Sequence, residues 1–125
     1  MDSRVEAVVE ILNQNWNRPL RVTSLARAVG LSTVRLQHLF KKEKGVSIRG
    51  YHMDQRLTRA ATLLLNPVWR VKEVCHLVGF ADLRDFRRSF KRRYKAAPTA
   101  FRQASRDAHA DVLQKTDTSV NTVPQ

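Results

Sequence analysis

Apolar residues recur along this 125-residue chain at intervals of three and four, which is the period of amphipathic helices. In the first such segment the residues on the apolar face are Val5, Val8, Val9, Leu12 and Trp16. The β-branched residues are scattered and do not alternate with polar ones, so the pattern does not favour strands. The sequence therefore predicts an all-α protein of about seven helices.

Glycine, proline and N-cap residues divide this pattern into separate helices. The expected divisions are a first helix ending before Pro19, a short helix over 23–29 stopped by Gly30, a helix from the N-cap Ser32 to Lys44 before Gly45, and a longer one over about 47–65 stopped before Pro67. The short second helix, the glycine and the third helix together form a helix-turn-helix motif.

The second half of the chain repeats the first. The residues Val22, Leu25, Ala26, Val29, Gly30 and Leu31 recur 49 positions later as Val71, Val74, Cys75, Val78, Gly79 and Phe80. With one residue inserted in the turn, Leu36, Phe40, Lys41, Lys42, Tyr51 and Arg56 recur 50 positions later as Phe86, Phe90, Lys91, Arg92, Phe101 and Arg106. Two homeodomain-like helix-turn-helix subdomains in tandem are predicted, over 1–46 and 66–106, joined by a linker helix over 47–65.

The end of the chain differs from the rest. Pro98 suits the first turn of a final helix that is expected to run towards Lys115. Residues 107–125 are rich in Thr, Asp and Ser and carry more acidic than basic groups. We expect this tail to be partly disordered and leave its role open.

Charge narrows the choice of partner. The chain holds 23 Lys and Arg against 11 Asp and Glu, a net charge of +12, and this balance favours a polyanion such as nucleic acid. No apolar run approaches the ~20 residues of a membrane span, so a cytoplasmic protein, nucleoid-associated when bound, is expected. The lone Cys75 fits a reducing compartment and is interpreted as a small core residue.

Nothing in the sequence indicates catalysis. His38, His52, His76 and His109 have no metal-ligand spacing, and there is no glycine-rich phosphate loop or nucleophile elbow. An enzyme, a metal site and a cofactor are therefore not expected.

The buried side of each predicted second helix fixes which residues point outward. The outward residues are Val34, Arg35, Gln37, His38 and Lys41 in the first copy, and Leu83, Arg84, Arg87, Arg88 and Lys91 in the second. Arg, Gln and His carry donors suited to base edges, and Lys suits phosphate. Val34 suits a thymine methyl group, and we expect Leu83 to make such a contact in preference to the alternative, packing on the turn. The helix starts near Thr23 and Val71 are further phosphate candidates.

The linker sets the scale of the predicted DNA complex. About 19 helical residues span roughly 28 Å, against ~34 Å for one turn of DNA. Two recognition helices on one such spacer fit successive major grooves without dimerisation, and because they differ, the site should be asymmetric. If the spacer is shorter than the groove repeat, the DNA bends or the second helix inserts poorly.

Several segments carry a family resemblance. They are 25–32, 36–41, 71–80, 86–91 and 98–102. Over about residues 5–106 the chain resembles the DNA-binding domain of the AraC/XylS family of bacterial transcription regulators. The resemblance to the short MarA, SoxS and Rob type implies monomeric DNA binding and activation through contact with RNA polymerase.

Four positions depart from that family pattern. Cys75 stands where a small Ala is common. Lys95 stands where a glycine usually ends the second recognition helix, Val34 where MarA-type activators carry Trp, and Leu83 where they carry a polar amide. The target sequence therefore cannot be transferred from the family.

Other functions remain open at this point. The chain could be a non-specific architectural DNA-binding protein, the DNA-binding fragment of a longer ligand-sensing regulator, or a basic module that docks an acidic protein. A preferred DNA sequence would distinguish the regulator from the architectural protein.

Overall fold

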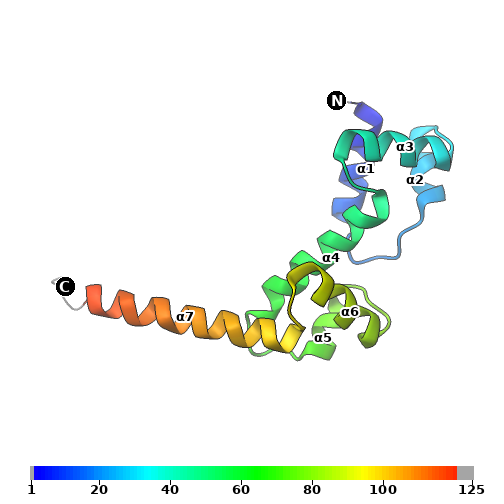
Figure 1. The fold of residues 1–125 in the computed structure, drawn as a ribbon. Coiled ribbons are helices and arrows are strands. Elements are labelled where there is room, and N and C mark those ends of the chain that lie inside the picture. The colour runs from blue at the N-terminus through cyan, green and yellow to red at the C-terminus, as the bar shows by residue number, and fades with distance from the viewer. Residues whose placement is uncertain (1, 121–125) are drawn as a thin grey trace.

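The computed structural model describes residues 2–120, and the side chains of 2–108 and 110. Those residues form helices joined by turns, without a strand, as the all-α prediction required (Figure 1). The helices are α1 (Ser3–Gln14), α2 (Val22–Val29), α3 (Thr33–Lys44), α4 (Ile48–Leu64), α5 (Val71–Leu77), α6 (Leu83–Tyr94) and α7 (Pro98–Val120).

Local capping explains where the central helices begin and end. The Ser32 hydroxyl caps α3 by accepting a hydrogen bond from the Arg35 N–H at 3.1 Å. The Ser47 hydroxyl caps α4 in the same way, by accepting from the Gly50 N–H at 3.0 Å. Gly30 ends α2 in the left-handed conformation, with φ of 72°. The boundaries of α2, α3 and α4 thus lie within a residue or so of those predicted.

Two separate apolar cores hold the helices together. The first consists of Val5, Val8, Leu12, Leu25, Ala26, Leu36, Phe40 and Ile48. The second consists of Leu57, Ala60, Leu64, Val74, Cys75, Val78, Phe80, Phe86 and Phe90. We call α1–α3 with the first core the first unit, and α5–α6 with the second core and the start of α7 the second unit. The helix α4 contributes Ile48 to one core and Leu57 to the other, so it is a structural part of both units.

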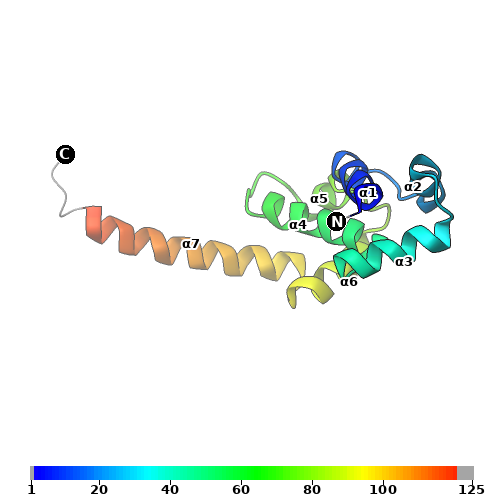
Figure 2. The same cartoon turned by 90° about the horizontal axis from the view of Figure 1, so that it is seen from above.

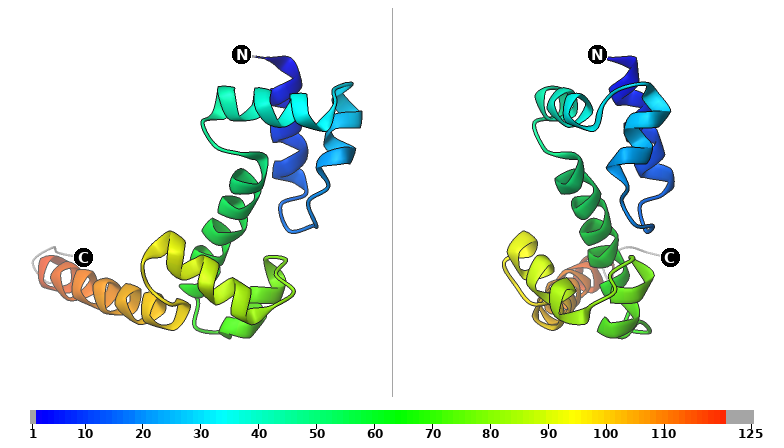
Figure 3. Two further views of the ribbon diagram at one scale, coloured as in Figure 1. Left: turned by 45° about the vertical axis from the view of Figure 1, so that its right-hand side comes forward. Right: turned by 90° about the vertical axis from the view of Figure 1, so that its right-hand side faces the viewer.

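The two units lie at the two ends of α4. The views in Figures 2 and 3 place α3 and α6 on the same side of that helix, running in roughly the same direction. This arrangement presents both predicted recognition helices towards one side of the molecule.

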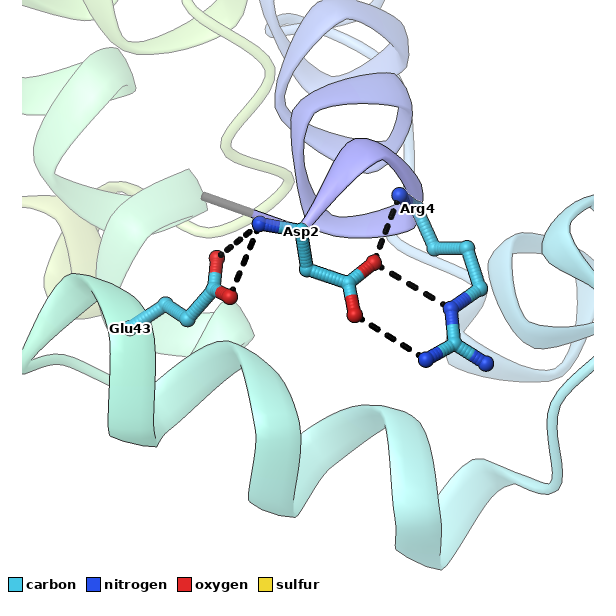
Figure 4. Close-up of polar contacts among 3 residues, drawn as sticks. All are labelled: Asp2, Arg4 and Glu43. Carbon is cyan, nitrogen blue, oxygen red and sulfur yellow. Dashed lines mark hydrogen bonds and ion pairs between the residues drawn. The ribbon is translucent and has the colours of Figure 1, made fainter.

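A polar contact at the start of the chain fixes α1 against α3 (Figure 4). The Glu43 carboxylate on α3 accepts hydrogen bonds from the Asp2 backbone N–H, at 2.9 and 3.2 Å. Asp2 itself caps α1 by accepting from the Arg4 N–H and guanidinium, which lowers its pKa to about 2. The cap of α1 and the last turns of α3 are therefore linked.

The final helix runs further than the sequence suggested. α7 begins at the predicted Pro98, whose ring is fully buried, and continues to Val120, extending away from the rest of the molecule (Figure 1). No glycine or proline interrupts residues 99–120, so nothing in the covalent structure stops the helix at Lys115. Residues 121–125 of the expected disordered tail lie outside the described part of the chain.

Candidate nucleic-acid interface

The outward side of α3 is the first candidate surface. Leu36 and Phe40 are fully buried in the first core, and the helical period therefore turns the positions between them outward. The exposed residues are the predicted ones, Val34, Arg35, Gln37, His38 and Lys41. Val34 is 74% exposed, although a valine side chain gains stability from burial.

The polar side chains on this surface are available to a ligand. Within the part of the chain that the structure describes, Arg35, Gln37, His38 and Lys41 make no side-chain hydrogen bond or ion pair. A guanidinium, an amide, an imidazole and an ammonium group therefore stand side by side without internal partners. These are the donor types that read base edges and contact phosphates.

The outward side of α6 is the second candidate surface, and it is more basic. Asp82 caps the helix by accepting from the Arg84 N–H at 2.9 Å, while Phe86 and Phe90 are fully buried. The exposed residues are Arg84, Arg87, Arg88 and Lys91, as predicted. Of these, Arg88 is partly engaged, because it donates to Asp85 at 3.2 Å across an exposed ion pair. Such a pair contributes little to stability and leaves the guanidinium free to exchange partners.

Leu83 differs from the other predicted residues of α6. It is half-buried and packs against the second core, so its side chain is only partly available to a base. The reason is its position in the repeat. The N-caps of α3 and α6, Ser32 and Asp82, are 50 residues apart. Leu83 therefore corresponds to Thr33 in the first copy, and Arg84 corresponds to Val34. Of the two roles predicted for Leu83, packing is the one that this geometry favours.

Arg93, at the end of α6, has a structural role that the sequence did not reveal. Its guanidinium donates to the Asp54 carboxylate on α4 at 2.6 Å and lies over the Tyr94 ring at 4.8 Å. The Asp54 carboxylate raises the pKa of Arg93. No local pattern in the sequence pairs Arg93 with a residue 39 positions away.

The two helix starts proposed as phosphate sites are not equivalent. The first N–H groups of α2 receive no side-chain cap, which leaves donors free for an anion. At the start of α5, the Glu73 carboxylate accepts from the Arg70 N–H at 2.8 Å. That negative charge opposes a phosphate there.

Cys75 belongs to the apolar core of the second unit. Cys75 is fully buried in the second core, its thiol lies 3.7 Å from the Phe80 carbonyl, and burial raises its pKa. A protonated buried thiol is a core residue, as predicted.

Among the described residues no cluster of three or more His, Cys, Asp or Glu side chains could hold a metal ion. The same residues contain no helix of the length and apolarity that a bilayer crossing needs.

Comparison with known proteins places these surfaces in context. Residues 25–104 match a family model described as a helix-turn-helix domain. The chain is 33% identical over 116 residues to the arabinose operon regulatory protein of Escherichia coli, covering 92% of this chain and 40% of that protein. It is 32% identical over 99 residues to the Msm operon regulatory protein of Streptococcus mutans, covering 79% of this chain and 36% of that protein. The chain thus spans well under half the length of these relatives.

A solved structure matches the arrangement of both units. The DNA-binding domain of AdpA, a global transcriptional factor solved in complex with a target DNA, superimposes with a TM-score of 0.77 at 25% identity. The match covers 84% of this chain and 95% of that domain. The likeness therefore includes the relative placement of the two units as well as each unit alone.

Proposed function

The chain belongs to the AraC family of helix-turn-helix DNA-binding transcription regulators, and from that premise we propose that it sets α3 and α6 into successive major grooves of one asymmetric DNA site. The family confirms the resemblance seen in the sequence, and it is a family of regulators, not of enzymes. The observation that carries the proposal is the placement of two exposed, donor-rich helices on the same side of α4 (Figure 3).

In the first groove we assign base reading to Arg35 and Gln37. A guanidinium pairs with O6 and N7 of guanine, and an amide pairs with N6 and N7 of adenine. Val34 offers an exposed methyl surface to thymine, Lys41 neutralises phosphate, and His38 suits either role. The N-terminal turns of α3 carry the readers, which is the end of a recognition helix that enters the groove.

In the second groove we assign guanine reading to Arg84 and Arg87. They lie three positions apart on α6, so they share a face, and neither has an intramolecular side-chain partner among the described residues. Arg88 and Lys91 follow the phosphate backbone. Because α3 is mixed in chemistry and α6 is strongly basic, we expect two unlike half-sites.

A single polypeptide supplies both helices, so we propose that one copy binds one site. Two curated relatives are named for the operons that they regulate, which supports a role in transcription. From the family resemblance we further propose that the protein activates transcription through contact with RNA polymerase and is located at the cytoplasmic nucleoid. The transcription assay below tests the activation.

The net charge of +12 favours a second candidate, an architectural protein that binds any duplex. Selection of bound duplexes from a random pool at near-physiological salt distinguishes the two. We expect one asymmetric motif with two boxes about one helical turn apart. Recovery of duplexes without a common motif would favour the architectural protein.

Variants then assign each box to a helix. Gln37→Ala should relax the first box and Arg84→Ala the second, each with a loss of about 1 to 3 kcal/mol on the selected site. Affinity for random duplex is the matched control, since a pure phosphate contact would weaken both DNAs equally. Equal losses on both DNAs would remove the reading role from that residue.

Activation is tested separately by transcription in vitro from a promoter that carries the selected site. Added protein should raise transcript yield only when both boxes are present. Unchanged yield would contradict activation, and a lower yield would indicate repression.

A further inference from the structure

Arg56, near the middle of α4, makes an unusual set of hydrogen bonds. Its Nε donates to the Trp16 carbonyl at 3.1 Å, Nη1 to the Gly79 carbonyl at 3.0 Å, and Nη2 to the Arg18 carbonyl at 2.6 Å. Every guanidinium nitrogen therefore donates to a backbone carbonyl. These bonds reach 40, 23 and 38 positions along the chain.

The three carbonyls belong to different units. Trp16 and Arg18 lie in the loop between α1 and α2 of the first unit, whereas Gly79 lies in the helix-turn-helix turn of the second. Since α4 carries Arg56, one guanidinium joins both units and the helix between them.

Other contacts bring the two units together at the same point. A Cβ atom on Gly79 would lie 2.6 Å from the Asn17 carbonyl oxygen, so the first-unit loop almost touches the second-unit turn. Trp16 packs against the second core although it follows a first-unit helix. The Arg56 cation also lies 5.8 Å from the centre of the Phe80 ring.

The geometry favours arginine specifically. The planar guanidinium fork holds its donors at fixed angles, whereas a lysine ammonium is a flexible point charge. Burial lowers the pKa of Arg56, and no carboxylate lies within ion-pair distance of it among the described residues. The carbonyls are therefore the groups that compensate the cation, and they hold it in one position.

We propose that Arg56 is a positioning residue that fixes the separation and rotation of α3 relative to α6, and so sets the half-site spacing that the protein accepts. The inference about DNA spacing rests on the proposed function. One base pair moves a half-site by ~3.4 Å along the duplex and ~35° around it. A junction held by three directional hydrogen bonds resists such a displacement, and a junction without them allows it.

The first test measures spacing preference. Binding is measured on the selected site and on the same site with one base pair inserted or removed between the boxes. We expect the unaltered protein to lose at least tenfold in affinity at either changed spacing. Arg56→Gln should reduce that loss to about threefold or less, with its affinity for a single box unchanged.

Arg49→Gln is the matched control for this test. Arg49 is exposed on the first turn of the same helix and makes no side-chain hydrogen bond among the described residues, and the substitution removes the same charge. It should preserve the ratio between spacings even if overall affinity falls. An Arg56→Gln variant that keeps the original ratio would overturn the proposal.

The second test needs no DNA. Spin labels at Lys42→Cys and Arg92→Cys, exposed and equivalent positions on α3 and α6, report the distance between the units in a Cys75→Ala background. We expect one narrow distance distribution with Arg56 and a broader or shifted one with Arg56→Gln. Arg56→Lys serves as a second variant that keeps the charge, and it should broaden the distribution too if Arg56→Gln does not fold.

The two tests separate the two ideas. Broadened distances without any selected DNA motif would support the positioning role of Arg56 and contradict the proposed function. Unchanged distances in folded Arg56 variants would overturn the positioning role and leave the proposed function standing.

Discussion

Replacing Gly79 with alanine is expected to destabilise the protein more than the same replacement at Gly30, although the two glycines occupy matching turns of the repeat. Both residues have positive φ, 72° at Gly30 and 94° at Gly79. An alanine is therefore strained at either position. The difference lies in what the added methyl group meets.

The structure gives a magnitude for that difference. A Cβ at Gly30 meets nothing within 4 Å, so only the backbone strain of about 1 kcal/mol applies. At Gly79 the methyl group would lie 2.6 Å from the Asn17 carbonyl oxygen and 3.0 Å from the Arg56 Cζ atom. Forcing a methyl group into such a packed site adds about 1 to 3 kcal/mol. We therefore expect a loss of about 1 kcal/mol for Gly30→Ala and about 2 to 4 kcal/mol for Gly79→Ala.

Urea denaturation followed by circular dichroism measures both losses, and thermal melts should show the same order. A double-mutant cycle with Arg56→Gln tests the mechanism, because removing the guanidinium removes part of the clash. The loss caused by Gly79→Ala should be smaller in that background. If the two glycine substitutions destabilise the protein equally, within about 0.5 kcal/mol, the close approach between the units is not a determinant of stability.

Three further predictions concern other parts of the molecule. Lys95 ends α6 with φ of 63°, so Lys95→Gly should raise the free energy of unfolding, measured in urea, by about 0.5 to 1 kcal/mol. As a control, the same change at the exposed Lys42 within α3 should lower it by about 1 kcal/mol. A lower free energy of unfolding for Lys95→Gly would contradict the strain argument. His52 is buried, and burial together with the nearby Arg56 cation lowers its pKa below 6.5, so its neutral form is the one that the folded state favours. Stability should therefore be constant above about pH 7 and fall as the pH drops below 6.5, by at most about 1.4 kcal/mol per pH unit, and this part of the pH dependence should be absent from His52→Gln. The 17 residues of α4 span only about 25 Å, less than the ~34 Å groove repeat, so the bound DNA should bend. Bending makes the electrophoretic mobility of the complex depend on where the site lies within a DNA fragment, and a mobility independent of that position would contradict this expectation.

The sequence by itself determined the helices, the repeat and the two candidate surfaces. Helix period, N-caps such as Ser32 and left-handed C-caps such as Gly30 act over a few neighbouring residues, so their signals can be read locally. Burial of Leu36 and Phe86 then fixes what faces outward, because the helical period leaves no other choice. For this reason nearly all of the predicted outward side chains are exposed in the structure.

Tertiary structure decided what lies between distant segments. The exposure of Leu83 depends on where the inserted turn residue places the start of α6. Arg93 donates a hydrogen bond to Asp54, which lies 39 positions away in the sequence. Arg56 was visible in the sequence only as one member of the repeat, yet its place in the fold brings it to carbonyls of both units. Such contacts depend on how the helices pack in three dimensions, and the period of a single helix carries no information about them.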